Sequence, residues 1–141
     1  MAIEIKSTRS SAMDGVKCIL FGNSGVGKTT QLGTIEGKTV ILSAESGLLV
    51  LKDKDIDVVD IDSVSTLGKV YSALKSGELN YDNVCIDSLT EIGDMIVKEL
   101  EADEYYGNPS NTFKLWGEYT SRMIDICKLF RDLKGKNVVF T

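Results

Sequence analysis

The sequence predicts an α/β fold in which a mostly parallel β-sheet is covered by helices on both faces. Three observations lead to this prediction. Short apolar runs of strand length alternate with longer segments that have helical spacing. The apolar runs are hydrophobic throughout rather than at every second position, which is typical of parallel strands buried on both faces. The first run leads into a glycine-rich loop and then a helix.

Five short runs rich in β-branched and apolar residues are the predicted strands. They are Val16–Phe21, Thr39–Ser43, Asp57–Ile61, Asn83–Asp87 and Asn137–Thr141. The third run is more polar than the others and is expected nearer an edge of the sheet. Cys18 and Cys85 lie in runs that we interpret as buried strands, where a thiol behaves as a small hydrophobic side chain.

Four segments have apolar residues spaced three or four apart and are the predicted helices. They are Thr29–Ile35, Val64–Lys75, Leu89–Glu104 and Thr112–Leu133. Gly77 and Gly135 follow two of them and are expected to end those helices. Residues 1–14 are polar and are predicted to form an arm, which leaves residues 15–141 as one core domain.

The composition excludes several kinds of functional site and of protein. The chain has 141 residues with a net charge of −5, which rules out a uniformly basic nucleic-acid surface but not a local basic patch. It has no histidine and no C-x-x-C pair, which excludes a zinc site and a histidine-based catalytic triad. No apolar run approaches the roughly 20 residues of a membrane span, and the N-terminus lacks a secretory signal. The expected location is therefore the cytoplasm, with no membrane contact.

The segment from Gly22 to Thr29 fits the pattern G-x-x-x-x-G-K-[ST] at every fixed position. Its glycines let the backbone turn tightly and bring N–H groups against phosphate oxygens, at the positive end of the next helix. Lys28 is expected to reach the β and γ phosphates of ATP, and the Thr29 hydroxyl to bind Mg²⁺. The predicted fold is therefore a three-layer P-loop NTPase. The residues expected to bind the nucleotide are Gly22, Asn23, Ser24, Gly25, Val26, Gly27, Lys28, Thr29 and Thr30.

A carboxylate beside the phosphate loop is needed to hold the magnesium, usually through water. Asp87 ends an apolar strand and is the predicted magnesium residue. Asp60 and Asp62 are its rivals, but their strand is shorter and more charged. Ser88 and Glu91 have the spacing of a capping box at the start of the following helix.

Hydrolysis also needs a group that orients or deprotonates the attacking water. Glu45 follows the strand Thr39–Ser43 at the sheet end where open α/β folds bind ligands. Glu91 competes with it, one helical turn after Asp87. Because Asp87 is followed by Ser88, the adjacent Asp-Glu pair of many ring ATPases is missing.

Several segments resemble RecA-type recombinases. Residues 41–48, which read I-L-S-A-E-S-G-L, resemble the strand-end D-A-E-x-x-L segment of that family. The order of strand, helix and a strand ending in Asp-Ser is the same, and residues 128–141 resemble the next helix and sensor-bearing strand. Over roughly residues 15–141 the chain is similar to phage-encoded RecA-like ATP-binding proteins, a group linked to single-strand annealing and recombination.

The resemblance implies Mg²⁺-dependent ATP hydrolysis in phage DNA recombination, in the host cytoplasm, with Glu45 and Lys28 as catalytic residues. It implies single-stranded DNA as a partner and a homo-oligomer, either a ring or a filament. RecA cores continue with further strands and a second DNA loop, so the chain is expected to be a fragment or a reduced version. Thr141 lies near the position of the sensor residue.

By the same resemblance, the loop Tyr105–Pro109 with Trp116 occupies the place of the first DNA-contacting loop. Aromatic rings there can stack on bases. The competing interpretation is that Trp116 and Tyr119 pack their helix onto the sheet, and four acidic residues before the loop would repel phosphates. The predicted apolar stripe of this helix is Phe113, Trp116, Tyr119, Met123, Ile126, Cys127 and Phe130.

Two other function classes stay open. A small-molecule kinase would need arginines around its acceptor, and the chain has only Arg9, Arg122 and Arg131. A nucleotide-dependent switch or assembly subunit would bind ATP and hydrolyse it hardly at all. Arg122 and Arg131 are candidate arginine fingers for a neighbouring subunit, or simply solvated charges on a long helix.

Overall fold

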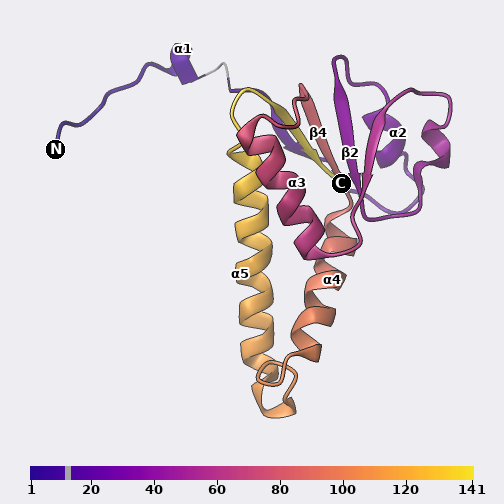
Figure 1. Cartoon of the computed structure of the whole chain (residues 1–141), viewed down its shortest axis with the longest axis vertical. Helices are drawn as coiled ribbons and strands as arrows, with labels where there is room; N and C mark the ends of the chain where they lie inside the picture. Colours follow the sequence, from indigo (N-terminus) through magenta and orange to yellow (C-terminus); the bar gives the residue numbers. More distant parts are fainter. Residues whose placement is uncertain (12–13) are drawn as a thin grey trace.

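The computed structural model describes residues 1–11 and 14–141 and has one five-stranded sheet (Figure 1). Every strand pair is parallel, and the strand order is β1-β5-β4-β2-β3. The strands are β1 Lys17–Ile19, β2 Thr39–Ser43, β3 Asp57–Asp60, β4 Asn83–Asp87 and β5 Asn137–Phe140. The predicted α/β fold with a parallel sheet is confirmed, including the edge position of β3.

Five helices lie in the described part of the chain, of which the first precedes the sheet and the other four connect strands. They are α1 Thr8–Ser11, α2 Lys28–Leu32, α3 Val64–Ser76, α4 Leu89–Ala102 and α5 Thr112–Arg131, with 3₁₀ turns η1 Leu48–Leu51 and η2 Pro109–Asn111. Helix α2 is shorter than predicted because the N–H of Gly33 turns back to the carbonyls of Gln31 and Thr30. Gly77 ends α3 in the left-handed conformation, as expected, with φ 84°.

Two apolar clusters cover the two faces of the sheet, which confirms the predicted layers. Alternate residues of β2 point to opposite sides: Val40 and Leu42 belong to the cluster beneath α3, α4 and α5. Ile41 belongs to a smaller cluster with Leu32 of α2 and Leu51 of η1. In Figure 1 the three long helices lie on one side of the sheet and α2 lies on the other.

The run Val16–Phe21 contains strand β1, as predicted, but the prediction that this strand is buried is wrong. Strand β1 pairs only with β5 in the part of the chain that the structure describes, so it forms an edge of the sheet. Ile19 is 54% exposed and Phe21 is 88% exposed. The apolar composition of this run therefore does not reflect burial here, and Cys18 is only half-buried.

Helices α4 and α5 run away from the sheet as a long antiparallel pair, joined at the far end by the Tyr105–Asn111 loop (Figure 1). At the start of α5 the buried residue is Leu115, which is 6% exposed and belongs to the core cluster. Phe113 is 92% exposed and Trp116 is half-exposed, so the predicted apolar stripe is wrong at this end. Nearer the sheet it is correct, since Phe130 is buried.

Residues 1–7 have no regular secondary structure, and their side chains are exposed. The short helix α1 follows them, and this segment extends away from the sheet in Figure 1. The arm predicted over residues 1–14 includes residues 12 and 13, which lie outside the described residues. Within the described ranges, no helix combines the length and hydropathy needed to cross a bilayer.

Cys85 is expected to resist thiol reagents in the folded protein. It is fully buried in β4, and burial raises the pKa of its thiol to about 12. Because the thiolate is the reactive form, only about 10⁻⁴ of it is available at pH 8. Mass spectrometry after brief labelling should find Cys85 unmodified in the native chain and modified after unfolding, with half-buried Cys18 and Cys127 as internal controls. Equal native labelling of all three would contradict this.

Candidate functional site

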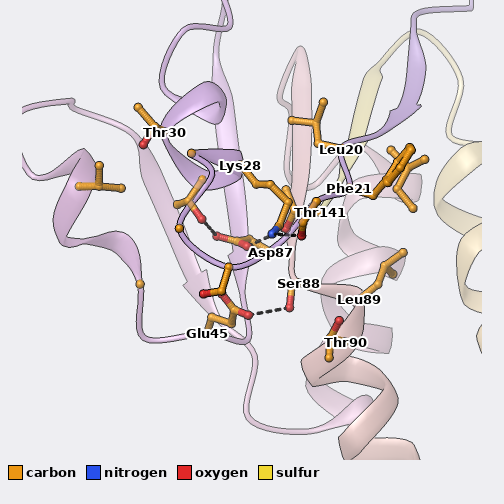
Figure 2. A pocket seen from close by; sticks show the side chains of 18 residues that line it. Leu20, Phe21, Lys28, Thr30, Glu45, Asp87, Ser88, Leu89, Thr90 and Thr141 are labelled. Atoms are coloured by element: carbon orange, nitrogen blue, oxygen red, sulfur yellow. Dashed lines mark hydrogen bonds between the residues drawn. The ribbon is translucent and has the colours of Figure 1, made fainter.

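A cavity of about 690 Å³ opens at the carboxyl ends of the parallel strands (Figure 2). This is the edge where open α/β sheets bind ligands, because the loops that leave the strands converge there. Nine of the residues predicted from sequence line it: Gly22, Ser24, Gly25, Gly27, Lys28, Thr29, Thr30, Glu45 and Asp87. Asn23 and Val26, also predicted, are not among its lining residues.

The loop between β1 and α2 turns through three glycines with positive φ, the first of which is Gly22 with φ 157°. Gly25 has φ 81° and Gly27 has φ 94°. Gly27 is also the N-cap of α2, where the left-handed conformation favours glycine. A side chain at Gly25 would meet nothing within 4 Å, so the backbone conformation, rather than crowding, requires a glycine there. Left-handed glycines of this kind let a loop turn tightly, which is typical of phosphate-binding loops.

The ammonium of Lys28 lies over this loop. Its Nζ donates hydrogen bonds to the carbonyl oxygens of Gly22, at 2.8 Å, and Asn23, at 3.1 Å. Among the described residues no carboxylate pairs with it. The positive charge is therefore held in the cavity by neutral partners only, which leaves it available to an anion.

Asp87 receives two hydroxyl donors. Thr29 Oγ1 donates to Oδ2 at 2.9 Å, and Thr141 Oγ1 donates to Oδ1 at 2.7 Å. The Asp87 side chain is buried, at 2% exposure, and no cationic side chain in the described part of the chain forms an ion pair with it. The peptide bond that follows it is cis.

The side-chain oxygens of Thr29 and Asp87 fit a magnesium ion. The described ranges contain no cluster of three or more histidine, cysteine or acidic side chains that could hold a metal by themselves. Mg²⁺ does not require one, because it usually takes one or two protein oxygens and completes its shell with phosphate oxygens and water. The hydroxyl of Thr29 beside the carboxylate of Asp87 supplies such a pair next to the phosphate loop.

The rival aspartates lie elsewhere. Asp60 ends the edge strand β3 and does not line the cavity. Asp62 accepts hydrogen bonds from Thr66 Oγ1, at 2.5 Å, and Ser63 Oγ, at 3.1 Å, and these bonds lower the pKa of its carboxyl group. Asp62 therefore supports the start of α3, and Asp87 is the one of the three that reaches the cavity.

The two candidate glutamates, Glu45 and Glu91, also differ in whether they line the cavity. Glu45 lines the cavity, and its Oε1 accepts a hydrogen bond from Ser88 Oγ at 3.0 Å (Figure 2). Glu91 lies in the first turn of α4 and does not line the cavity. Its backbone N–H donates to Ser88 Oγ at 3.5 Å, which is the Ser88 half of the predicted capping box.

Sequence reasoning missed two contacts. It treated Ser88 only as a helix cap, and it assigned Thr141 no partner. The bond from Ser88 to Glu45 arises because β2 and β4 are neighbours. The bond from Thr141 to Asp87 arises because β5 and β4 are neighbours. Polar residues at strand ends are the sequence signal, but strand order is needed to pair them.

The remaining candidates lie away from the cavity. Tyr105 and Tyr106 sit at the far end of the α4–α5 pair, where Asp103 Oδ1 accepts both of their backbone N–H groups. Tyr105 is half-exposed, and Lys114 donates to its hydroxyl at 2.7 Å. The two candidate finger arginines are paired within the chain, with Glu99 and Glu118 at Arg122 and with Asp132 at Arg131.

The chain matches a family model described as an AAA domain, over residues 14–141. The matched region includes the phosphate loop and every other residue named above as lining the cavity. No curated protein matches the chain significantly.

Proposed function

Because the chain belongs to the family of AAA domains, which are P-loop ATPase domains, we propose that it is a Mg²⁺-dependent ATPase of the RecA-like type. One observation carries the proposal. Lys28, the Thr29–Asp87 pair and Glu45 all line one cavity. They represent the three requirements of ATP hydrolysis: phosphate binding, metal binding and water activation.

The chemistry follows from these positions. The loop N–H groups and the Lys28 ammonium bind the β and γ phosphates and offset the charge that develops during phosphoryl transfer. Thr29 and Asp87 would hold Mg²⁺, which would neutralise phosphate charge. Glu45 orients a water molecule and accepts its proton as the oxygen attacks the γ-phosphorus. The bond between the γ-phosphorus and the bridging oxygen breaks, and ADP and inorganic phosphate leave.

The magnesium assignment predicts a selective effect of Asp87→Asn. The amide keeps the size of the side chain but loses the negative charge, so the apparent affinity for Mg²⁺ in the presence of ATP should fall about 10–100-fold. Titrating Mg²⁺ against the binding of a fluorescent ATP analogue measures this. Asp62→Asn removes the same charge outside the cavity and should have no effect. If Asp62→Asn or Asp60→Asn changes the Mg²⁺ dependence and Asp87→Asn does not, the assignment is wrong.

A role in DNA recombination or single-strand annealing, in a phage-encoded protein, is the finer part of the proposal. It is supported by the position of Glu45 at the end of β2, beside the Asp-Ser end of β4, as the resemblance to RecA-type proteins implies. We propose single-stranded DNA as the partner, with half-exposed Tyr105 as a stacking surface. Exposed acids at Glu101, Asp103 and Glu104 oppose phosphate binding there, so Lys114 would be the local cation. Assembly into a ring or filament is proposed on the same resemblance.

ATP hydrolysis measured with and without single-stranded DNA tests the proposal. Stimulated hydrolysis supports a DNA-dependent ATPase. Hydrolysis that DNA does not change supports the ATPase and removes DNA as the partner. ATP binding without hydrolysis, in the presence or absence of DNA, would replace the ATPase with a nucleotide-dependent switch.

A further inference from the structure

Ser88 lies between β4 and α4 and is 5% exposed. Its hydroxyl has two partners: the backbone N–H of Glu91, at 3.5 Å, and Glu45 Oε1, at 3.0 Å. A hydroxyl carries one proton. The N–H of Glu91 can only donate, so Ser88 Oγ accepts there, and its own proton is directed to the Glu45 carboxylate.

Glu45 needs such a partner. Its backbone is fixed, because its N–H donates to the Asp87 carbonyl at 3.3 Å and its carbonyl accepts from Ser43 Oγ at 2.6 Å. Its side chain is exposed, and a free glutamate side chain samples several rotamers. Among the described residues, Ser88 is the one hydrogen-bond donor to this carboxylate, and it leaves Oε2 free.

We propose that Ser88 is a positioning residue for Glu45, an inference that rests on the proposed ATPase function. The Ser88 hydroxyl holds one carboxylate oxygen of Glu45, and this selects the rotamer in which the other oxygen is free to take the proton of the attacking water. Figure 2 shows the link as a dashed line between the Glu45 carboxylate and Ser88. The cap of α4 and the orientation of Glu45 therefore depend on a single oxygen atom.

A second serine provides a matched control. Ser63 is the N-cap of α3, and its hydroxyl accepts the backbone N–H of Thr66 at 3.1 Å. It does not line the cavity. Ser63→Ala and Ser88→Ala thus both remove a helix cap, with a similar expected loss of about 4 °C in Tm. They differ in whether Glu45 loses its donor.

The experiment compares steady-state ATP hydrolysis, Mg²⁺ dependence and thermal melting of these variants in the full chain. Ser88→Ala should lower kcat about tenfold or more while KM for ATP stays within about twofold, since misplacing a catalytic group by 1 Å can cost about 10²-fold. Ser88→Thr keeps a hydroxyl and should keep most of kcat. Ser63→Ala should keep the parent kcat. The double variant Glu45→Gln with Ser88→Ala should be no slower than Glu45→Gln alone.

Three results would overturn the inference. In the first, Ser88→Ala has the parent kcat while Glu45→Gln is inactive, so that the ATPase function stands and the positioning role does not. In the second, Ser88→Thr is as slow as Ser88→Ala although it melts normally. In the third, Ser88→Ala changes the Mg²⁺ dependence, which would mean that it acts through Asp87. Parent activity of Glu45→Gln would instead refute the water-activating role in the proposed function, and the positioning role with it.

Discussion

Lys28→Ala is expected to reduce ATP affinity about 100-fold or more. The ammonium is held over the phosphate loop by two carbonyls and has no carboxylate partner in the described residues, so its charge is available to phosphate. A hydrogen bond to a charged group contributes about 1.5–3 kcal/mol, and Lys28 can make two to the β and γ phosphates. Titration of a fluorescent ATP analogue, followed by its anisotropy, measures the loss.

The fold should change little, because Lys28 contributes no packing to either apolar cluster. Its thermal melt without nucleotide should therefore match that of the parent chain. Lys38→Ala is the matched control: it removes the same charge just before β2, where Lys38 lies over the Tyr81 ring and outside the cavity. If Lys28→Ala binds ATP like the Lys38→Ala control, the loop is not the phosphate site.

Glu45→Gln is expected to lower kcat about 10²–10⁴-fold while ATP affinity stays nearly unchanged, as is typical when a general base is removed. Glutamine keeps the length of the side chain and can still accept the hydrogen bond from Ser88, but it cannot take a proton from water. Single-turnover hydrolysis, with binding measured in parallel, separates the chemical step from affinity.

Glu91→Gln is the control for this prediction. Its backbone N–H still donates to Ser88, and the side chain lies outside the cavity. The loss is limited to a negative charge near the N-terminus of α4, which costs about 0.3–1 kcal/mol of stability. The assignment fails if Glu91→Gln is the variant that binds ATP without hydrolysing it.

The fold and the phosphate loop could be predicted because their signals are local. Glycine spacing defines the loop, and continuous apolar runs define parallel strands. Strand order is not local. The sequence of Val16–Phe21 looks like that of an interior strand, but within the described residues β1 has one neighbour in the sheet, and Phe21 is exposed. Edge and interior strands differ in what pairs with them rather than in composition.

The same limit explains which residues of the site could be predicted and which of their contacts could not. Lys28, Asp87 and Glu45 were predicted because each follows a recognisable strand or lies within a motif. The partners of the acids were missed, because Ser88 and Thr141 meet them only through the pairing of β4 with β2 and β5. Helix α5 shows the limit of periodicity: helical spacing predicted burial at Phe113, but the residue that is buried at the start of this helix is Leu115.

The strand order also has a consequence for how the protein is made. The phosphate loop follows β1 and Asp87 ends β4, but β5 lies between these two strands. Across the junction of β1 and β5, the N–H of Val16 donates to Asn137 Oδ1, 121 residues later in the chain. During synthesis, β1 therefore has no place on the sheet until β5 has left the ribosome. Because contacts this distant in sequence form slowly, we expect bound nucleotide to stabilise the nascent chain only after β5 has paired with β1 and β4.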